Sequence, residues 1–192
     1  ISGLVEQNGG GNLSIYLQIS RGADQQRDHA FPSGNLPPTV FGMASTMAEP
    51  HPEQMGLRAI TRADQRWSRC DIKSTALLAN LLARQAARDA GAGEAILLRD
   101  GYLTEGSASS VIIVERGVLI RRPDGPEVLP GTTTDAVFAA AAGAGLACRD
   151  EMISEQRLRQ ADEIWIAAAT RGITPVLELD GKKIGDGRPG PI

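Results

Sequence analysis

RWSRCDIKS, at residues 66–74, carries a lysine at residue 73 and leads into the segment STALLANLLARQAARDA, at residues 74–90. Apolar side chains recur in the second segment at helical spacing and glycines follow it, so it is predicted to form a helix. The apolar positions are Leu77, Leu78, Leu81, Leu82 and Ala86, and the glycines are Gly91 and Gly93. Lys73 is therefore expected just before the helix N-terminus, where the positive end of the helix dipole favours an amine that loses its proton. The alternative is a surface lysine at a loop–helix junction.

The composition is that of an ordinary globular protein. The chain has 192 residues, of which 42% are hydrophobic and 22% are charged, so it suits one generous domain or one domain plus part of another. With 20 basic and 23 acidic residues the net charge is -3. No basic stripe for a nucleic acid and no polybasic face for a membrane is found in the sequence. Small molecules are therefore the expected partners.

The cysteines and the N-terminal segment favour a cytoplasmic location. Cys70 and Cys148 stand far apart, without CxxC or histidine spacing, so the sequence predicts neither a metal site nor a disulfide framework. No segment has the length and apolar character of a membrane span. The initial ISGLVEQNGGG also lacks the basic start and apolar centre of a signal peptide.

Periodicity and turn signals predict strands and helices without an internal repeat. Strands are predicted at residues 13–20, 39–44, 57–60, 94–98, 111–114, 118–120, 163–168 and 174–179, further helices at 136–144 and 155–160, and a small-residue loop at 102–110. GGGN at residues 9–12 is interpreted as a turn, because no Gly-Lys-Ser/Thr follows it as in a phosphate-binding loop. The proline-bearing STMAEPHPEQ is typical of a linker. It predicts an N-terminal part at 1–46, a linker at 47–54 and a large domain at 55–192.

Three segments could form one pocket for an aromatic aldehyde cofactor such as pyridoxal phosphate. Lys73 offers an amine for the aldehyde. Glu105, alone among a glycine and serines, offers a carboxylate that keeps a pyridine nitrogen protonated, and a protonated ring stabilises a carbanion. Gly131, Thr132 and Thr133, at the start of a helix, offer backbone N–H groups and hydroxyls for a phosphate. Spacing alone does not select this cofactor over another.

Each of these features also has a simpler interpretation. Glu105 suits a solvated loop acid. Thr132–Thr134 with Asp135 suit an ordinary helix cap. The three features gain weight because they occur together in one chain.

Four blocks carry a resemblance to a known family: RWSRCDIKS at residues 66–74, TEGSASS at 104–110, LPGTTTD at 129–135 and ITPVLELDGKKIGDG at 173–187. They resemble the fold-type IV pyridoxal-phosphate enzymes, and within these the D-amino acid (D-alanine) aminotransferases most closely. The resemblance implies an α+β fold in which a strand pseudo-barrel with flanking helices forms the large C-terminal domain. Only the end of the small N-terminal α/β domain is present in these residues.

The resemblance also assigns the cofactor site. It implies that Lys73 is the catalytic residue, which forms the Schiff base with pyridoxal 5'-phosphate and moves the proton of the substrate alpha carbon. Glu105 corresponds to the carboxylate that pairs with the pyridine nitrogen, and Leu129 to the leucine that packs on the ring. Thr132 and Thr133 correspond to the phosphate cup.

Two further features match the family less closely. A phosphate-binding threonine of the family is replaced by Ala169, and the neighbouring Thr170 is the expected cofactor-binding residue instead. Arg27 and His29 resemble the Arg-x-His pair that binds the substrate carboxylate, and this pair predicts D-amino acid substrates. The loop between Arg21 and Arg27 is one residue longer than in the family pattern. Without the resemblance, a solvent-facing arginine and a hydrogen-bonded loop histidine would suit these positions equally well.

The implied function is transamination of a D-amino acid with a 2-oxo acid acceptor, by a homodimer. Branched-chain aminotransferase, aminodeoxychorismate lyase and (R)-selective amine transaminase share the lysine and the glutamate and remain alternatives. The family's N-terminal strands, with a phosphate-binding arginine and an active-site tyrosine, and its final helix have no counterpart here. An inactive fragment that binds the cofactor is therefore a further alternative.

Overall fold

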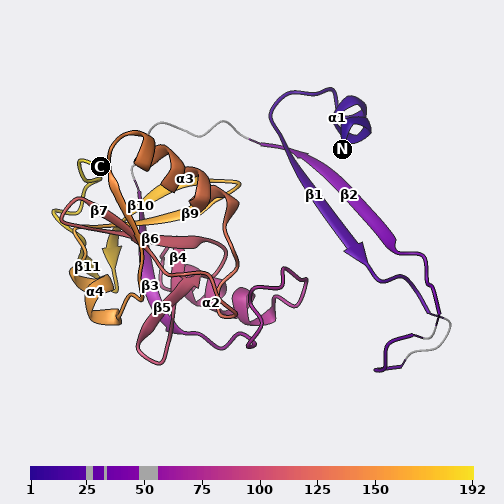
Figure 1. The fold of residues 1–192 in the computed structure, drawn as a ribbon, viewed down its shortest axis with the longest axis horizontal. Helices are drawn as coiled ribbons and strands as arrows, with labels where there is room; N and C mark the ends of the chain where they lie inside the picture. The colour runs from indigo at the N-terminus through magenta and orange to yellow at the C-terminus, as the bar shows by residue number, and fades with distance from the viewer. Residues whose placement is uncertain (25–27, 33, 48–55) are drawn as a thin grey trace. The chain divides into compact units, whose positions relative to one another are not determined.

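The computed structural model describes residues 1–24, 28–32, 34–47 and 56–192 (Figure 1). The chain forms two compact units, Ile1–His51 and Pro52–Ile192. The predicted linker at 47–54 lies outside the described residues, apart from Met47. The predicted domain boundaries therefore remain a prediction.

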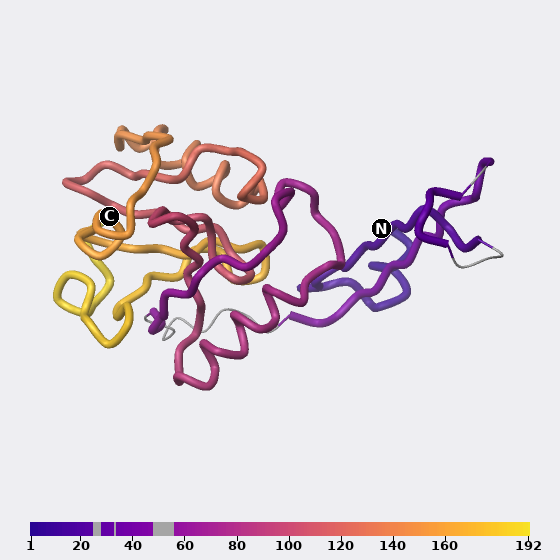
Figure 2. Tube along the Cα trace, turned by 90° about the horizontal axis from the view of Figure 1, so that it is seen from below, coloured from indigo at the N-terminus to yellow at the C-terminus, as the bar shows by residue number. Residues whose placement is uncertain are grey.

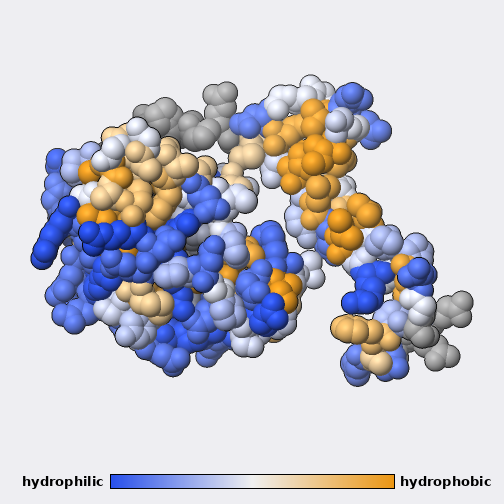
Figure 3. Space-filling model, in the orientation of Figure 1, coloured by the Kyte–Doolittle hydropathy of each residue, from blue (hydrophilic) through white to orange (hydrophobic). Residues whose placement is uncertain are grey.

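The first unit is a β-hairpin preceded by a short helix that the sequence pattern does not predict. Helix α1 is Ser2–Gln7, and strands β1, Leu13–Ser20, and β2, Thr39–Thr46, pair antiparallel along their whole length. Both predicted strands are confirmed, and β2 is two residues longer than predicted. Apolar side chains gather on the surface of the hairpin (Figure 3), where Tyr16, Leu17, Ile19, Val40, Phe41 and Met43 are exposed.

The second unit is built on a nine-stranded sheet. Its strands are β3 Leu57–Ala63, β4 Glu94–Arg99, β5 Tyr102–Gly106, β6 Ser110–Glu115, β7 Val118–Arg121, β8 Ala147–Asp150, β9 Glu163–Ala168, β10 Gly172–Leu179 and β11 Lys182–Lys183. The hydrogen-bonded order is β5-β4-β3-β10-β9-β6-β7-β8, and β11 pairs with β10. β3 is parallel to β4 and β10, and β7 to β8, whereas the other pairs are antiparallel. The mixed sheet with its helices agrees with the predicted α+β class.

The short connection between β5 and β6 makes this sheet curl. Only Ser107, Ala108 and Ser109 join the two strands, although β4, β3, β10 and β9 lie between them in the hydrogen-bonded order. The chain from Gly106 to Ser110 spans at most about 14 Å. In a flat sheet the two strands would be roughly 24 Å apart. The sheet therefore closes toward a half-barrel, as the predicted pseudo-barrel requires.

Both faces of the sheet are buried, which explains the unbroken apolar run in β6. Val111 and Ile113 belong to one core cluster, whereas Ile112 and Val114 belong to a second. Successive side chains of a strand point to opposite faces, so each cluster receives every second residue. Helix α3, Thr132–Gly143, packs on the second cluster.

Helix α2, Leu78–Asp89, begins four residues later than predicted. In the intervening segment the Ser74 hydroxyl accepts a hydrogen bond from the backbone N–H of Ala76, at 3.4 Å. A serine that bonds its own local backbone in this way competes with the first turn of a helix. Lys73 therefore precedes the first helical residue by five positions, and the expectation that it stands directly before the helix N-terminus is wrong.

The leucines of α2 are exposed on the second unit. Leu78, Leu81 and Leu82 have exposed fractions of 71%, 61% and 59%, whereas Ala87 on the opposite side is fully buried. Figure 2 shows α2, in magenta, at the periphery of this unit. The periodic spacing of apolar residues predicts the helix but not which of its sides is covered.

Most of the other predicted elements are confirmed. Helix α4, Glu155–Gln160, and strand β9 have the predicted bounds, and β6 and β7 form the predicted hairpin. The predicted turns at residues 100–101 and 180–181 adopt positive φ angles. The sequence does not predict β8 and β11, which have four and two residues. No helix in the described part of the chain is long and apolar enough to cross a membrane.

Candidate functional site

Glu105 lies on strand β5 rather than in a loop. The predicted loop at residues 102–110 is wrong in its first half, because Tyr102–Gly106 pairs with β4 and buries Leu103 and Thr104. Glycine and serine favour loops when considered alone, but pairing in a buried sheet outweighs that preference. The interpretation of Glu105 as a solvated acid is also wrong, because the residue is only 8% exposed.

The Glu105 carboxylate is held by two hydrogen-bond donors. One oxygen accepts a hydrogen bond from Arg66 Nη1. The other accepts from the backbone N–H of Leu129, at 3.2 Å. Glu105 and Leu129, which the sequence assigns to one cofactor site, are therefore in direct contact.

A pocket joins these residues to the N-terminus of α3. Its lining consists of Thr104, Glu105, Ser110, Val111, Arg121, Arg122, Asp124, Val128, Leu129, Gly131 and Thr134. Glu105 and Leu129 are the predicted site residues in this lining. Thr132 and Thr133 follow directly after Gly131, at the first two positions of α3.

Helix α3 begins earlier than predicted, at Thr132 instead of residue 136, so all three threonines lie in its first turn. Gly131 is the N-cap residue and provides no side-chain cap. Asp135, considered above as part of a cap, forms an ion pair with Arg121 at 2.5 Å. The first backbone N–H groups of a helix have no partner within the helix, so those of α3 are available to an anion.

Thr134 lines the pocket with a hydroxyl oxygen that has no hydrogen-bond partner among the described residues. Thr134 is only 3% exposed, and an unpaired buried hydroxyl costs about 1–3 kcal/mol. Gly131 leaves space beside it, because a Cβ atom there would lie 2.6 Å from Ser110 Oγ and 2.9 Å from Thr134 Oγ1. An open helix end with an unpaired hydroxyl and a glycine fits a phosphate group.

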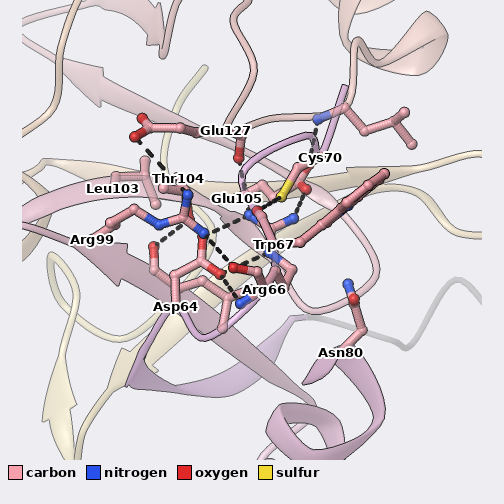
Figure 4. A network of polar contacts seen from close by, with 12 residues as sticks. Asp64, Arg66, Trp67, Cys70, Asn80, Arg99, Leu103, Thr104, Glu105 and Glu127 are labelled. Atoms are coloured by element: carbon pink, nitrogen blue, oxygen red, sulfur yellow. Dashed lines mark hydrogen bonds and ion pairs between the residues drawn. The ribbon is translucent and has the colours of Figure 1, made fainter. Parts of the chain in front are cut away.

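Arg66 connects the RWSRCDIKS segment to Glu105 (Figure 4). Its Nε and Nη2 donate to the two carboxylate oxygens of Asp64, at 2.9 and 2.8 Å. Burial alone would raise the pKa of Asp64, but hydrogen bonds and charge from Arg66, with a hydrogen bond from Thr104, outweigh it and lower the pKa to about 2. Asp64 is therefore ionised at neutral pH and balances the charge of Arg66.

Lys73 lies in the loop between Cys70 and α2, and its side chain is exposed. The start of this loop is fixed, because the backbone N–H of Cys70 donates to the Pro126 carbonyl at 2.7 Å. Pro126 stands three residues before Leu129 of the pocket lining. The lysine segment is thus attached beside the pocket, although Lys73 is not among the described residues that line it.

Three predicted residues have no contact that tests their role. Thr170 is exposed in a turn after β9. His29 is exposed in the first unit, where its backbone N–H donates to the Asp28 carboxylate at 2.6 Å. Arg27 lies outside the described residues. The substrate-binding pair and the role of Thr170 therefore stay predictions.

Sequence reasoning missed three residues around this site: Arg66, Asp64 and Thr134. Arg66 opens the most distinctive segment of the chain, but nothing near it in the sequence indicates a partner 39 residues later. A usable signal was the pair of opposite charges at residues 64 and 66, directly after an apolar strand. For Thr134 the signal was the third hydroxyl of LPGTTTD.

Comparison with known proteins places this geometry in a family. The family described as amino-transferase class IV matches residues 1–179. The chain is 38% identical over 190 residues to the D-alanine aminotransferase of Bacillus licheniformis, with 98% of this chain and 66% of that protein covered. It is 35% identical over 187 residues to the D-alanine aminotransferase of Staphylococcus haemolyticus, with 97% and 64% covered.

Solved structures support the same conclusion. The branched-chain amino acid aminotransferase of Escherichia coli superposes with a TM-score of 0.88 at 29% identity, covering 98% of this chain and 64% of that one. The branched-chain amino acid aminotransferase of T.th., solved with pyridoxamine 5'-phosphate, gives a TM-score of 0.89 at 28% identity over 97% of this chain and 63% of that one. The chain thus has the fold-type IV aminotransferase fold and spans 64–66% of the length of these D-alanine aminotransferases. It belongs to the class IV pyridoxal-phosphate-dependent aminotransferases.

Proposed function

We propose that this chain forms the cofactor-binding part of an enzyme that transfers the amino group of a D-amino acid to a 2-oxo acid with pyridoxal 5'-phosphate. One observation supports this most. A single pocket joins the buried carboxylate of Glu105 to the unpartnered hydroxyl of Thr134 at the N-terminus of α3. A phosphorylated pyridine ring needs both features, a carboxylate for its nitrogen and an anion site for its phosphate.

In this proposal each residue holds one part of the cofactor. The backbone N–H groups of Thr132 and Thr133 and the hydroxyls of Thr133 and Thr134 bind the phosphate. Leu129 packs on the ring, and Glu105 accepts a hydrogen bond from the ring nitrogen. When bound, the cofactor supplies an aldehyde for the amino group and a protonated ring that draws electrons from the substrate alpha carbon.

Lys73 has the catalytic role. Its amine holds the cofactor between turnovers and is released when the amino acid binds. Lys73 Nζ then takes the proton from the alpha carbon and delivers it to the carbon that carried the aldehyde. A positioned acid–base group of this kind contributes roughly a hundred- to ten-thousand-fold in rate. Thr170 adds a further contact to the phosphate.

The D-amino acid specificity is supported by the relatives and by the first loop. The D-alanine aminotransferases named above are 35–38% identical to the chain. Arg27 and His29 bind the substrate carboxylate in this proposal. Branched-chain transamination is the second candidate, because the two solved structures named above are branched-chain enzymes.

The decisive experiment loads the chain with pyridoxal phosphate and reduces it with borohydride. Reduction is expected to abolish the visible absorption of the cofactor and to leave a pyridoxyl group on the peptide that contains Lys73. The Lys73→Ala variant should show neither effect, whereas Lys182→Ala, which removes an exposed lysine of β11, should behave as the parent chain. An unchanged absorption and adduct in Lys73→Ala would refute the assignment of Lys73.

Turnover assays separate the possible substrates. D-alanine and L-leucine, each with 2-oxoglutarate, distinguish the D-amino acid from the branched-chain reaction, and a chiral amine tests for (R)-selective amine transamination. Release of pyruvate from aminodeoxychorismate would indicate a lyase. Cofactor binding without any turnover would support an inactive cofactor-binding fragment, an outcome that the partial coverage of the relatives makes relevant.

Assembly and location belong to the same proposal. We expect a homodimer, since the exposed leucines of α2 form an apolar surface of the kind that protein contacts cover. Light scattering of the purified chain tests this expectation. A reducing cytoplasm suits Cys70 and Cys148, which are both free thiols.

A further inference from the structure

We infer that Arg66 is a positioning residue for the cofactor, because it holds the Glu105 carboxylate ionised and aimed at the place of the ring nitrogen. This inference rests on the proposed function, since only a ring nitrogen gives Glu105 its partner. Arg66 would not touch the cofactor itself. Its effect would pass through Glu105.

The first argument is the way in which Arg66 is fixed. One edge of its guanidinium, Nε and Nη2, binds both oxygens of Asp64, and this leaves Nη1 for Glu105. A planar guanidinium gripped along one edge cannot rotate about its long axis, so the direction of its remaining N–H groups is determined. The side chains of Arg66, Asp64 and Glu105 are only 5%, 0% and 11% exposed. Water therefore competes little for these contacts.

The second argument is the support of Asp64 from two further strands (Figure 4). The Thr104 hydroxyl donates to Asp64 Oδ2 at 2.9 Å, and Arg99 Nη2 lies 3.1 Å from the same oxygen. Thr104 directly precedes Glu105 on β5, and Arg99 ends β4. The anchor of Arg66 and the backbone of Glu105 thus belong to one rigid frame.

The third argument is electrostatic. The positive charge of Arg66 favours the ionised form of Glu105, which a buried carboxyl group would otherwise resist. Asp64 balances Arg66, so the Asp64–Arg66 pair adds no net charge and Glu105 keeps its negative charge toward the pocket. Each carboxylate oxygen has two acceptor positions, and each oxygen of Glu105 uses one of them. Capacity for a ring N–H donor therefore remains.

The arrangement also joins the two ends of the proposed site. Arg66 stands seven residues before Lys73, in the same RWSRCDIKS segment. Its Nη2 donates in addition to the Glu127 carbonyl at 3.0 Å, two residues before Leu129. One side chain thus links the lysine segment, the carboxylate and the segment that carries Leu129.

The test compares two ligands, pyridoxal phosphate and an analogue with carbon in place of the ring nitrogen. Dissociation constants are measured by titration of the full chain and of its Arg66→Gln and Arg66→Lys variants. The parent chain should bind pyridoxal phosphate more tightly than the analogue. Arg66→Gln should weaken pyridoxal phosphate roughly ten- to a hundred-fold, the usual range for one oriented charge-assisted hydrogen bond. Its affinity for the analogue should change by less than about two-fold.

Arg66→Lys keeps the charge but lacks the planar fork, so its loss should be intermediate. This variant carries the comparison if Arg66→Gln does not fold. Arg149→Gln, at an exposed arginine outside the pocket lining, is the matched control and should affect neither ligand. Equal weakening of both ligands by the Arg66 variants, or no weakening of either, would overturn the inference. A parent chain that binds neither ligand, or does not distinguish them, would overturn the proposed function as well.

Discussion

The Ser109 hydroxyl donates a hydrogen bond of 2.9 Å to the buried carboxylate of Glu94, fifteen residues earlier in the chain. Ser107 donates to the other carboxylate oxygen, and Glu94 is only 2% exposed. The two serines belong to the connection that curls the sheet between β5 and β6. One buried acid on β4 thus fixes the loop that follows Glu105.

Glu94→Ala should destabilise the chain by about 3 kcal/mol. The change leaves two hydroxyls and the half-buried Arg84 without the carboxylate that they contact, and hydrogen bonds to a charged group contribute about 1.5–3 kcal/mol each. Urea unfolding measures the loss. Glu155→Ala is the control, because Glu155 makes an exposed i,i+4 ion pair with Arg159, and such pairs contribute only about 0.3–0.5 kcal/mol. Similar losses in both variants would contradict the structural role of Glu94.

Gly131→Ala should weaken binding of pyridoxal phosphate by roughly tenfold while the fold is kept. The φ angle of Gly131 is -102°, which alanine adopts without strain. The added Cβ would instead lie 2.6 Å from Ser110 Oγ and fill the space beside the first turn of α3. Titration with pyridoxal phosphate and with inorganic phosphate measures the effect. Gly143→Ala, at the other end of the same helix and with nothing within 4 Å of its Cβ, should bind normally.

Thr134→Val should change stability and binding in opposite directions. Valine has nearly the shape of threonine but removes a buried hydroxyl that has no partner among the described residues, so the unliganded chain should gain about 1 kcal/mol of stability. If that hydroxyl binds the phosphate, the affinity for pyridoxal phosphate should fall about tenfold. Thermal unfolding without ligand and titration with the cofactor measure the two effects. A loss of stability without a loss of affinity would show that the hydroxyl has a structural role.

Local sequence signals predict most of the elements of this fold, because periodicity and turn residues act over a few positions. The helix at Glu155–Gln160 is an example, since Ser154 caps it through a local hydrogen bond to the backbone N–H of Arg157. Long-range packing is beyond such signals. Tyr102–Gly106 resembles a loop by composition and becomes a strand only because β4 pairs with it.

The site follows the same division. Glu105 and Leu129 can be assigned from the sequence because their blocks resemble a known family. The link from Arg66 to Asp64 and Glu105 depends on three strands meeting at one place, which no spacing in the chain encodes. The predicted start of α2 is wrong because Ser74 forms a local bond that competes with the helix.

The Asp64–Arg66 pair predicts how stability depends on pH. The pKa of Asp64 is lowered from 3.8 to about 2, so the folded chain binds its proton less readily than the unfolded chain. The stabilisation, about 2 kcal/mol from the size of the shift, is fully present above pH 4 and is lost as the pH falls toward 2. Urea unfolding of the parent chain and of Asp64→Asn should therefore differ by a constant amount between pH 5 and pH 7 and converge below pH 4. Asp71→Asn, which removes an exposed partner of Arg69, is the control and should show only a small difference. A difference between the parent and Asp64→Asn that persists unchanged down to pH 2 would mean that another group, and not the ionised Asp64, holds Arg66 in place.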